Sequence, residues 1–344
     1  MNHGIATRIS LAALLLATWC QAVESAQATI YREGGKNITA WILTETFDGV
    51  TYALDNKGGQ AKSELKRGQY LRIEYESTLD PYLEVGQKHL AAGEWAKAVV
   101  PLTKAAASAK YAHLQEIASL KLAEAYIGDK KFVEAVAACD ALEKQAPRSP
   151  RLIDALFLKG RALALAGKVP EAEAVFARLK GMTGDAGPVA AAMAARGTAE
   201  LLRTQGKFAE AAAALDPVIK PLDPVANASE WGGAAVELAG DLIKAGKEAD
   251  ALVLLKKVCF SAADGPNRAR AHVIQARLLL AKPDGASAVA AFDQAALAAF
   301  GTDAGPMVRP EAKTLLKQAY DRIAKDPAIS DLDKRDYRVN ANRP

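Results

Sequence analysis

The segment Arg151–Lys180, RLIDALFLKGRALALAGKVPEAEAVFARLK, decides the fold of this chain. It contains two stretches of helical periodicity, which are separated at Gly167. In the first stretch Leu152, Leu156 and Leu163 lie on one helix face, and the second stretch has the same spacing of three to four residues. Because neither helix can bury its apolar face alone, the segment predicts a helix hairpin that packs against neighbouring hairpins.

The same pattern occurs six times, which predicts a repeat protein. The hairpins cover about residues 82–106, 116–146, 151–180, 194–219, 233–258 and 269–297. Each second helix begins with a small residue, at intervals of 37 to 40 residues: Ala98, Ala135, Ala172, Ala211, Ala251 and Ala288. Another small residue lies twelve positions earlier: Gly86, Ala123, Gly160, Ala199, Ala239 and Ala276. A larger residue lies four positions later in most repeats: Leu102, Cys139, Phe176, Leu215, Leu255 and Phe292. Small residues allow two helices to cross closely, and the larger side chain fills the gap beside them.

This register resembles the tetratricopeptide repeat, whose pattern has an apolar or aromatic residue at position eleven and glycine near position fifteen. Position eleven holds Tyr126, Leu163, Leu202, Leu242 and Leu279, and position fifteen holds Gly93, Gly167, Gly206 and Gly246. The resemblance covers about residues 80–298 and departs from the family pattern at Pro283, where glycine is usual. It implies a mainly α fold, a right-handed α-solenoid of about six hairpins, and a role in protein binding.

In this family the first helix of each repeat lines a concave groove, so the resemblance also implies a set of groove residues. Carried over by position, these are Leu83, Gln87, Leu120, Glu124, Phe157, Arg161, Arg196, Glu200, Arg203, Arg270 and Arg277. The groove would be apolar at its N-terminal end and basic at its C-terminal end, and it would hold a peptide or protein segment. Two simpler interpretations stay open. Leu83 and Leu120 could pack between helices, and the residues Arg196, Glu200 and Arg203 could form a solvated ion-pair ladder.

A β-rich segment, residues 29–77, precedes the repeats. Its five short runs rich in Thr, Ile, Val and Tyr are separated by glycine-containing turns such as Asp48-Gly49. They predict a small antiparallel β-barrel, because closure removes exposed strand edges. The order of the runs resembles the SH3-like or Sm-like barrels found at the start of exported bacterial proteins.

The repeats end with one more predicted helix, which begins at Pro310. Its apolar face could cover the last hairpin, as a capping helix does in a solenoid. The solenoid with this helix would therefore cover residues 80–325. Residues 326–344 are polar, and we expect a loosely held tail there.

Residues 1–22 predict a secretory signal peptide, with a positively charged start and a short apolar run. Small residues favour cleavage after Ala22, although cleavage as late as Ala28 is open. Trp19 stands where a lipoprotein signal before Cys20 needs a small residue, which argues against a lipid anchor. The apolar run is too short to span a bilayer comfortably. We therefore expect a periplasmic or secreted protein with no integral membrane segment after signal removal.

No motif in the sequence predicts catalysis, a metal site or a cofactor. There is no Cys-x-x-Cys, no His-Glu-x-x-His and no glycine-rich phosphate loop after a strand. His113 and His272 lack a second His or Cys four residues away, which metal ligation from one helix would need. Cys139 and Cys259 fall three repeats apart, which predicts two buried thiols and no disulfide. A net charge of +4 over 344 residues is too small to argue for nucleic acid as a partner.

These observations lead to three hypotheses. The first is a non-catalytic protein–protein interaction scaffold of the bacterial cell envelope, which binds a peptide or protein segment in the repeat groove. The second assigns binding to the β-barrel, whose Lys57, Lys62, Lys66, Arg67 and Arg72 could hold a cell-wall polymer or a protein, with the repeats as a platform for self-association. The third is a hydrolase with an unrecognised site, and the lack of any catalytic motif makes it the weakest.

Overall fold

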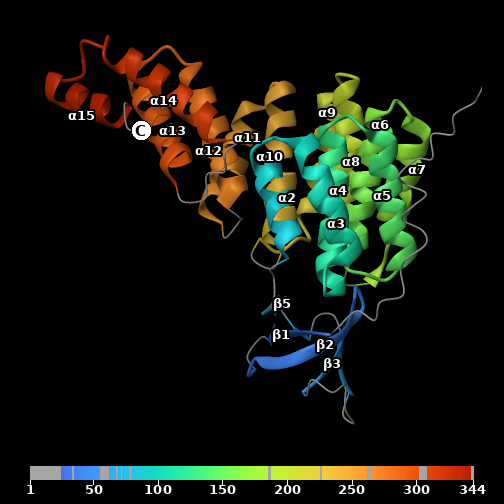
Figure 1. Ribbon diagram of the computed structural model, residues 1–344. Helices are drawn as coiled ribbons and strands as arrows, with labels where there is room; N and C mark the ends of the chain where they lie inside the picture. Colours follow the sequence, from blue (N-terminus) through green and yellow to red (C-terminus); the bar gives the residue numbers. More distant parts are fainter. Residues whose placement is uncertain are drawn as a thin grey trace, which may run out of the picture. The chain divides into compact units, whose positions relative to one another are not determined.

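The computed structural model describes residues 25–32, 35–54, 62–66, 69–70, 72–76, 80–184, 187–224, 227–261, 265–301 and 308–341 (Figure 1). The chain divides into two compact units, Met1–Ala186 and Gly187–Pro344. Most of the described chain is helical, as the repeat pattern predicts. The predicted signal peptide, residues 1–22, lies outside the described residues, and so do Lys57 and Arg67.

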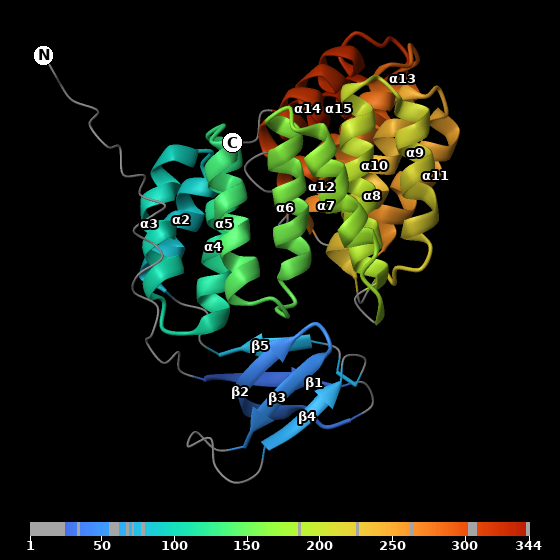
Figure 2. The ribbon, with the colours of Figure 1, turned by 90° about the vertical axis from the view of Figure 1, so that its right-hand side faces the viewer.

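The first unit begins with an antiparallel sheet of five strands (Figure 2). The strands are β1 (Ala26–Tyr31), β2 (Ile38–Thr46), β3 (Gly49–Ala53), β4 (Lys62–Lys66) and β5 (Arg72–Tyr75), in the spatial order β4-β3-β2-β1-β5. Alternating residues, among them Ala28, Ile30, Ala40 and Ile42, face a common apolar core. The sequence predicts these five strands. The pairings among the described residues place β4 and β5 at the edges, so closure into an SH3-like barrel stays a prediction.

Three helix hairpins follow the sheet in the first unit. Their helices are α2 (Pro81–Ala91), α3 (Trp95–Ser108), α4 (Ala112–Gly128), α5 (Phe132–Gln145), α6 (Leu152–Leu165) and α7 (Val169–Lys180). The first helices contact one another in the order α2, α4, α6. The second helices α3 and α5 each pack between the first helix of their own hairpin and that of the next. This two-layered order is the one that stacked repeats require.

The second unit repeats this arrangement. Its helices are α8 (Gly187–Thr204), α9 (Phe208–Ile219), α10 (Ala228–Lys244), α11 (Glu248–Phe260), α12 (Gly265–Leu280), α13 (Gly285–Phe300), α14 (Arg309–Ile323) and α15 (Asp331–Ala341). The helices α8, α10, α12 and α14 contact one another in this order. Helix α14 buries Leu315, Leu316, Ala319 and Ile323 in the same cluster as Phe292 of α13. It thus covers the last hairpin, as the sequence predicts.

Helix α15 corrects the expectation of a loosely held tail. Its start is capped because the backbone N–H of Asp333 donates to Ser330 Oγ at 3.2 Å, and Ser330 Oγ donates to Asp333 Oδ2 at 2.6 Å. The Tyr337 ring packs edge-on against Phe292, with 4.9 Å between the ring centroids. The segment is polar, but a cap and one aromatic contact are enough to hold it as a helix.

The predicted pairing of small and large residues at the helix crossings is present. A Cβ atom on Gly86 would lie 2.5 Å from Leu102 Cδ2, and one on Gly160 would lie 2.3 Å from Phe176 Cε1. Neither distance is tolerated between carbon atoms, so glycine is required for these helices to approach so closely. The corresponding alanines in the other hairpins have no exposed surface: Ala123, Ala199, Ala239 and Ala276.

We therefore predict that Gly160→Ala destabilises the protein by about 1–3 kcal/mol, because the new methyl group forces the buried Phe176 ring out of its position. Gly240→Ala is the matched control. A Cβ atom there meets no atom within 4 Å, and alanine is the better helix former by about 1 kcal/mol. Urea denaturation followed by circular dichroism measures both variants. Equal stability of the two variants would contradict the close crossing at Gly160.

Candidate functional site

In the first unit, the surface formed by α2, α4 and α6, here called the first-helix face, carries partly accessible apolar side chains. Leu120 and Ile127 of α4 are half-buried and pack against the same small cluster as Leu158 of α6. Leu165, at the end of α6, is 47% exposed. Adjacent first helices thus present apolar surface that the chain itself leaves partly uncovered.

Charged side chains border this apolar surface. Glu124 is half-buried and pairs with Lys121, with 2.8 Å between Oε1 and Nζ. The Arg161 guanidinium lies over the Phe157 ring, 5.7 Å from its centroid. Gln87 is exposed on α2. A peptide on this face would therefore meet apolar side chains and both signs of charge.

Two of the predicted groove residues of this unit serve the core instead. Leu83 is 3% exposed and packs with Leu102 in the core of the first hairpins, so its prediction as a groove residue is wrong. Phe157 is 9% exposed and lies beneath Arg161, so it supports the surface more than it forms it.

In the second unit, arginines of α8 are held by carboxylates of α10. Arg203 forms a bidentate pair with Asp241, with 2.7 Å from Nε to Oδ1 and 2.8 Å from Nη2 to Oδ2. Arg196 Nη2 lies 2.6 Å from Glu237 Oε1, and Glu237 Oε2 lies 3.5 Å from Arg203. The two arginines and two carboxylates form one network between neighbouring first helices.

This network corrects the prediction of an open basic groove at Arg196 and Arg203. The Asp241 side chain is only 3% exposed, and that of Arg203 is 25% exposed. Burial alone would lower the pKa of Arg203, but the hydrogen bond to Asp241 and the charge of Glu237 raise the pKa overall. The alternative interpretation, that these residues form ion pairs, agrees better with the observed contacts. The pairs of Arg196 and Arg203 with Glu237 and Asp241 join two helices, whereas the predicted ladder runs along one helix.

Glu200, Arg270 and Arg277 are the other predicted groove residues of the second unit. Glu200 is half-buried on α8. Arg270 is exposed, and its Nη1 lies 3.3 Å from Asn267 Oδ1. Arg277 is exposed and pairs with Glu311 of α14, so it bridges the last hairpin to the capping helix.

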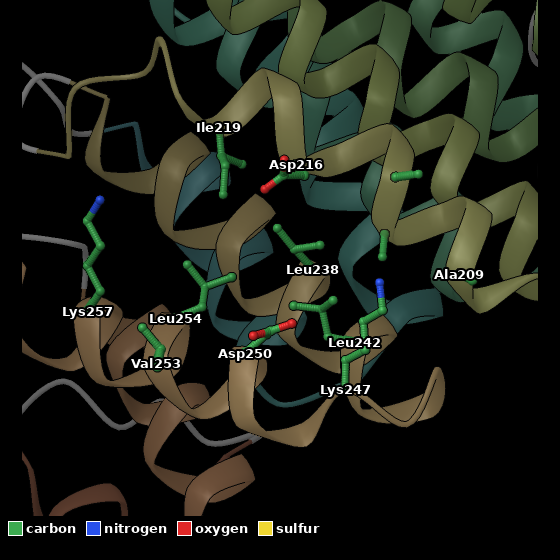
Figure 3. A pocket seen from close by; sticks show the side chains of 12 residues that line it. Ala209, Asp216, Ile219, Leu238, Leu242, Lys247, Asp250, Val253, Leu254 and Lys257 are labelled. Atoms are coloured by element: carbon green, nitrogen blue, oxygen red, sulfur yellow. The ribbon is translucent and has the colours of Figure 1, made fainter.

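A cavity of about 550 Å³ that the sequence did not predict opens between the second helices α9 and α11, over α10 (Figure 3). Leu238, Leu242 and Leu254 form an apolar floor. Lys247 and Lys257 lie at opposite ends of the cavity (Figure 3). It lies among helices of the outer layer, α9 and α11, where the family pattern gave no groove residues.

A second cavity, of about 630 Å³, lies inside the first unit between the sheet and the helices α4 and α6. Arg151 is central to it, because its Nη1 lies 3.1 Å from Glu116 Oε2 and 3.4 Å from Glu45 Oε2. Tyr75 Oη donates to Glu45 Oε2 at 2.7 Å, and Ser149 Oγ donates to Glu116 Oε2 at 2.8 Å. These residues come from β2, β5, α4 and the segment before α6.

Aromatic stacking completes this contact. The His113 ring stacks on Tyr75 with 3.8 Å between centroids and 10° between planes, and Tyr111 lies 5.8 Å from His113 on the same stack. Burial, together with the charge of Glu45, raises the pKa of Tyr75 far above its ordinary value, so the phenol stays protonated and donates its hydrogen bond. The sheet is thus fixed to the helices by a buried, charged and aromatic contact.

One cysteine–histidine pair comes together in space. Cys259 Sγ lies 3.6 Å from His272 Nδ1, but His272 Nδ1 lies 2.7 Å from Gln294 Oε1, and Gln275 Nε2 donates to the sulfur at 3.1 Å. The short contact to an amide oxygen requires Nδ1 to carry its hydrogen, so Nδ1 cannot accept the thiol proton. Burial raises the pKa of Cys259 to about 11, which opposes formation of a thiolate. The pair therefore does not have the arrangement of a nucleophile and its base.

In the described part of the chain, no group of three or more His, Cys, Asp or Glu side chains could hold a metal ion. None of the helices in that part is both long and apolar enough to cross a membrane. Cys139 is buried, Cys259 is half-buried, and both are free thiols.

Comparison with known proteins gives only distant likenesses. No protein-family model matches the chain, and no curated protein matches it. A kinesin light chain of Podosopora anserina with TPR-like repeats is 20% identical over 52% of this chain and 91% of its own, with a TM-score of 0.34. The apo quorum sensor NprR of B. thuringiensis is 16% identical over 75% of this chain and 74% of its own, with a TM-score of 0.45. The TPR2AB domain of yeast Sti1, solved in complex with an HSP90 peptide, is 17% identical over 69% of this chain and 96% of its own, with a TM-score of 0.31.

The residues that the sequence analysis missed are mostly the partners of those it found. Glu237 and Asp241 lie on the first helix of the repeat that follows Arg196 and Arg203. In the register that aligns Ala199 with Ala239, the positions equivalent to the two arginines hold Val236 and Ile243, so a comparison of equivalent positions alone does not reveal these pairs. Glu45, Tyr75 and Arg151 gave no signal, because up to 106 residues separate them in the sequence.

We predict that Asp241→Ala destabilises the protein by about 1–3 kcal/mol, because it leaves the half-buried Arg203 without its bidentate partner. Asp216→Ala, which removes an exposed pair with Lys220 on α9, is the control and should change stability by less than about 0.5 kcal/mol. Thermal unfolding at low and high salt measures both variants. Equal effects of the two substitutions would rule out a structural role for the α8–α10 network.

Proposed function

We propose that the protein is a non-catalytic scaffold that binds a peptide or protein segment along the first-helix face of its first unit. The observation that carries the proposal is the accessible apolar surface shared by α4 and α6, which includes Leu120, Ile127 and Leu165. Apolar side chains on a surface rimmed by charges gain free energy when a partner covers them, at about 25 cal/mol for each Å² removed from water.

The two units differ in the side chains that their first helices present to a ligand. In the second unit Arg196 and Arg203 are occupied by Glu237 and Asp241, so a ligand would have to displace existing ion pairs. In the first unit the apolar residues require no such exchange. We therefore assign binding to α4 and α6, at the N-terminal end of the predicted groove.

We also propose that the protein is exported and acts in the bacterial cell envelope. The signal-peptide pattern of residues 1–22 motivates this proposal. The position of β1 favours cleavage after Ala22, because cleavage after Ala28 would remove the first three residues of a paired strand, among them Ala26 and Ala28 of the sheet core.

The alternative, a cell-wall polymer bound by the sheet, gains no support from the placement of its basic residues. Lys62 and Lys66 lie on the edge strand β4, where lysines protect an unpaired edge against aggregation. Arg72 lies over the Tyr31 ring at 4.1 Å and pairs with Glu74 at 3.3 Å. These contacts give the charges a structural explanation.

Photo-crosslinking in intact cells tests the binding proposal. A photoreactive amino acid at Leu165 should give a discrete adduct, and one at Val133, which is 73% exposed on the second helix α5, should not. Leu165→Asp should then reduce co-purification of the adducted protein at least about fivefold, because a loss of 1 kcal/mol corresponds to a factor of about five. Val133→Asp should leave it unchanged. Identical adducts from both positions would refute the assignment to the first-helix face.

The export proposal has its own test. Mass spectrometry of the protein from the cell envelope should show a mature chain that begins at Val23. A chain that keeps residues 1–22 and stays in the cytoplasm would refute export. A chain that begins at Thr29 would refute the cleavage position and would show that the sheet tolerates loss of half of β1.

A further inference from the structure

The cavity between the sheet and the helices of the first unit carries unbalanced negative charge. Glu45 and Glu116 are 14% and 13% exposed, and both contact the single guanidinium of Arg151. Arg148, which also lines the cavity, is paired with Asp48. Arg151 is therefore the one positive charge that the two carboxylates share, and about one negative charge remains in excess. Such an excess favours an additional cation in a partly buried site.

The same cavity contains a short open strand edge. β1 pairs with β2 as far as Ala26, which lies opposite Ile42. The end of β2, from Thr44 to Thr46, pairs only with β3 among the described strands, with a bulge between Ile42 and Thr44. Ser25, Leu43 and Thr44 line the cavity at this point. Within the described part of the chain no residue pairs with the β1 side of this end of β2, so a strand that continues β1 could pair there.

The antiparallel register indicates which residues could fill this edge. Because Ala26 lies opposite Ile42, continuation of β1 would place residue 24 opposite Thr44 and residue 23 opposite Glu45. The bulge in β2 can shift this register by one residue. Two residues of strand extend about 7 Å.

We propose that this cavity is the docking site for the N-terminus of the processed chain. Hydrolysis of the Ala22–Val23 peptide bond adds one water molecule, leaves a carboxylate on Ala22 and creates an α-ammonium group on Val23. Val23 and Glu24 then continue β1 along the free edge of β2, and the ammonium group pairs with Glu45 and Glu116. The inference rests on the proposed export, because signal cleavage creates the group that docks.

Docking only after cleavage follows from the chemistry. Before cleavage residue 23 contributes an uncharged peptide nitrogen, which supplies no positive charge to the carboxylates. After cleavage the ammonium forms charge-assisted hydrogen bonds with them. The processed chain would therefore have a more firmly held sheet–helix contact than the precursor, which couples maturation to the stability of the first unit.

The pH dependence has a definite sign. An ammonium group that gains carboxylate partners has a pKa above the ordinary value for an α-amino group, about 7.7–8.0. The contribution of the ammonium group to the free energy of unfolding is complete below the ordinary pKa of an α-amino group. It is lost as the pH rises through the raised pKa of the docked group. The charged and titratable groups around it are Glu24 of the same segment, Glu45 of β2, Tyr75 of β5, His113 and Glu116 of α4, and Arg148 and Arg151 before α6. Of these, His113 adds positive charge when protonated, so the test is best made above its ordinary pKa of about 6.5.

The test compares two full chains that differ only in their start, one at Val23 and a longer one at position 21, both released from a removable tag. The longer chain carries Gln21→Ser, because an N-terminal glutamine cyclises and loses its free amino group. Acylation of the α-amino group by a limiting reagent is followed by mass spectrometry at about pH 7. The chain that begins at Val23 should react about tenfold more slowly, which corresponds to a rise of one unit in the pKa of its amino group. Equal rates for the two chains would overturn the proposal.

Two variants identify the partners. Glu45→Gln keeps an acceptor for the Tyr75 hydroxyl but removes the charge, and it should raise the rate of the Val23 chain toward that of the longer chain. Glu64→Gln, at an exposed position of β4, is the matched control and should leave the slow rate unchanged. If neither Glu45→Gln nor Glu116→Gln raised the acylation rate of the Val23 chain, the proposal would also be overturned.

A second measurement covers the case that Glu45→Gln unfolds the sheet. Acetylation of the Val23 amino group should lower the midpoint of thermal unfolding near neutral pH and have no effect well above the raised pKa. No change at neutral pH would count against docking. Both chains are made without the export machinery, so this experiment tests docking alone. The position of signal cleavage is tested separately, by the mass of the mature chain from the cell envelope.

Discussion

The close crossing of the two helices in each hairpin is the constraint on which the structure depends. Gly86 and Gly160 leave no room for a Cβ atom beside Leu102 and Phe176, and the equivalent positions in other hairpins hold fully buried alanine. Because the crossing is tight, the first and second helices form separate layers, and each layer contacts its neighbours in order. The layers in turn decide which side chains can reach a partner.

The first-helix layer is used differently in the two units. In the second unit its polar residues pair with each other across α8 and α10, and the bidentate contact of Arg203 with Asp241 closes the surface. In the first unit the corresponding layer carries Leu120, Ile127 and Leu165 with part of their surface in water. A network of satisfied charges is costly to break, whereas an exposed apolar surface is stabilised by being covered. This difference in side-chain chemistry distinguishes the ion-paired face of the second unit from the proposed binding face of the first.

The repeated helices, the five strands and the capping helix could be predicted from the sequence, because each depends on local periodicity and turn residues. Leu83 could not be assigned correctly, since its position in the repeat fits both the groove and the core and only burial decides between them. Helix α15 was missed because its composition is polar, although the cap at Ser330 was readable. Glu237 was missed because the charges were read along one helix and not between the first helices of two neighbouring repeats. The contact of Cys259 with His272 was missed because it joins residues of two different helices.

The sheet shows how a local pattern can leave the tertiary role of a segment undetermined. The chain runs from β5 into α2, yet the sheet makes its polar and aromatic contacts with α4 and with the segment before α6. The backbone N–H of Phe47 also donates to the carbonyl oxygen of Arg148 at 3.0 Å. The sheet therefore joins the second and third hairpins at one end, and it restrains their relative rotation more than stacking alone would. Since α4 and α6 carry the proposed binding face, a contact that fixes these two helices also fixes the spacing of Leu120 and Leu165 that a partner would meet.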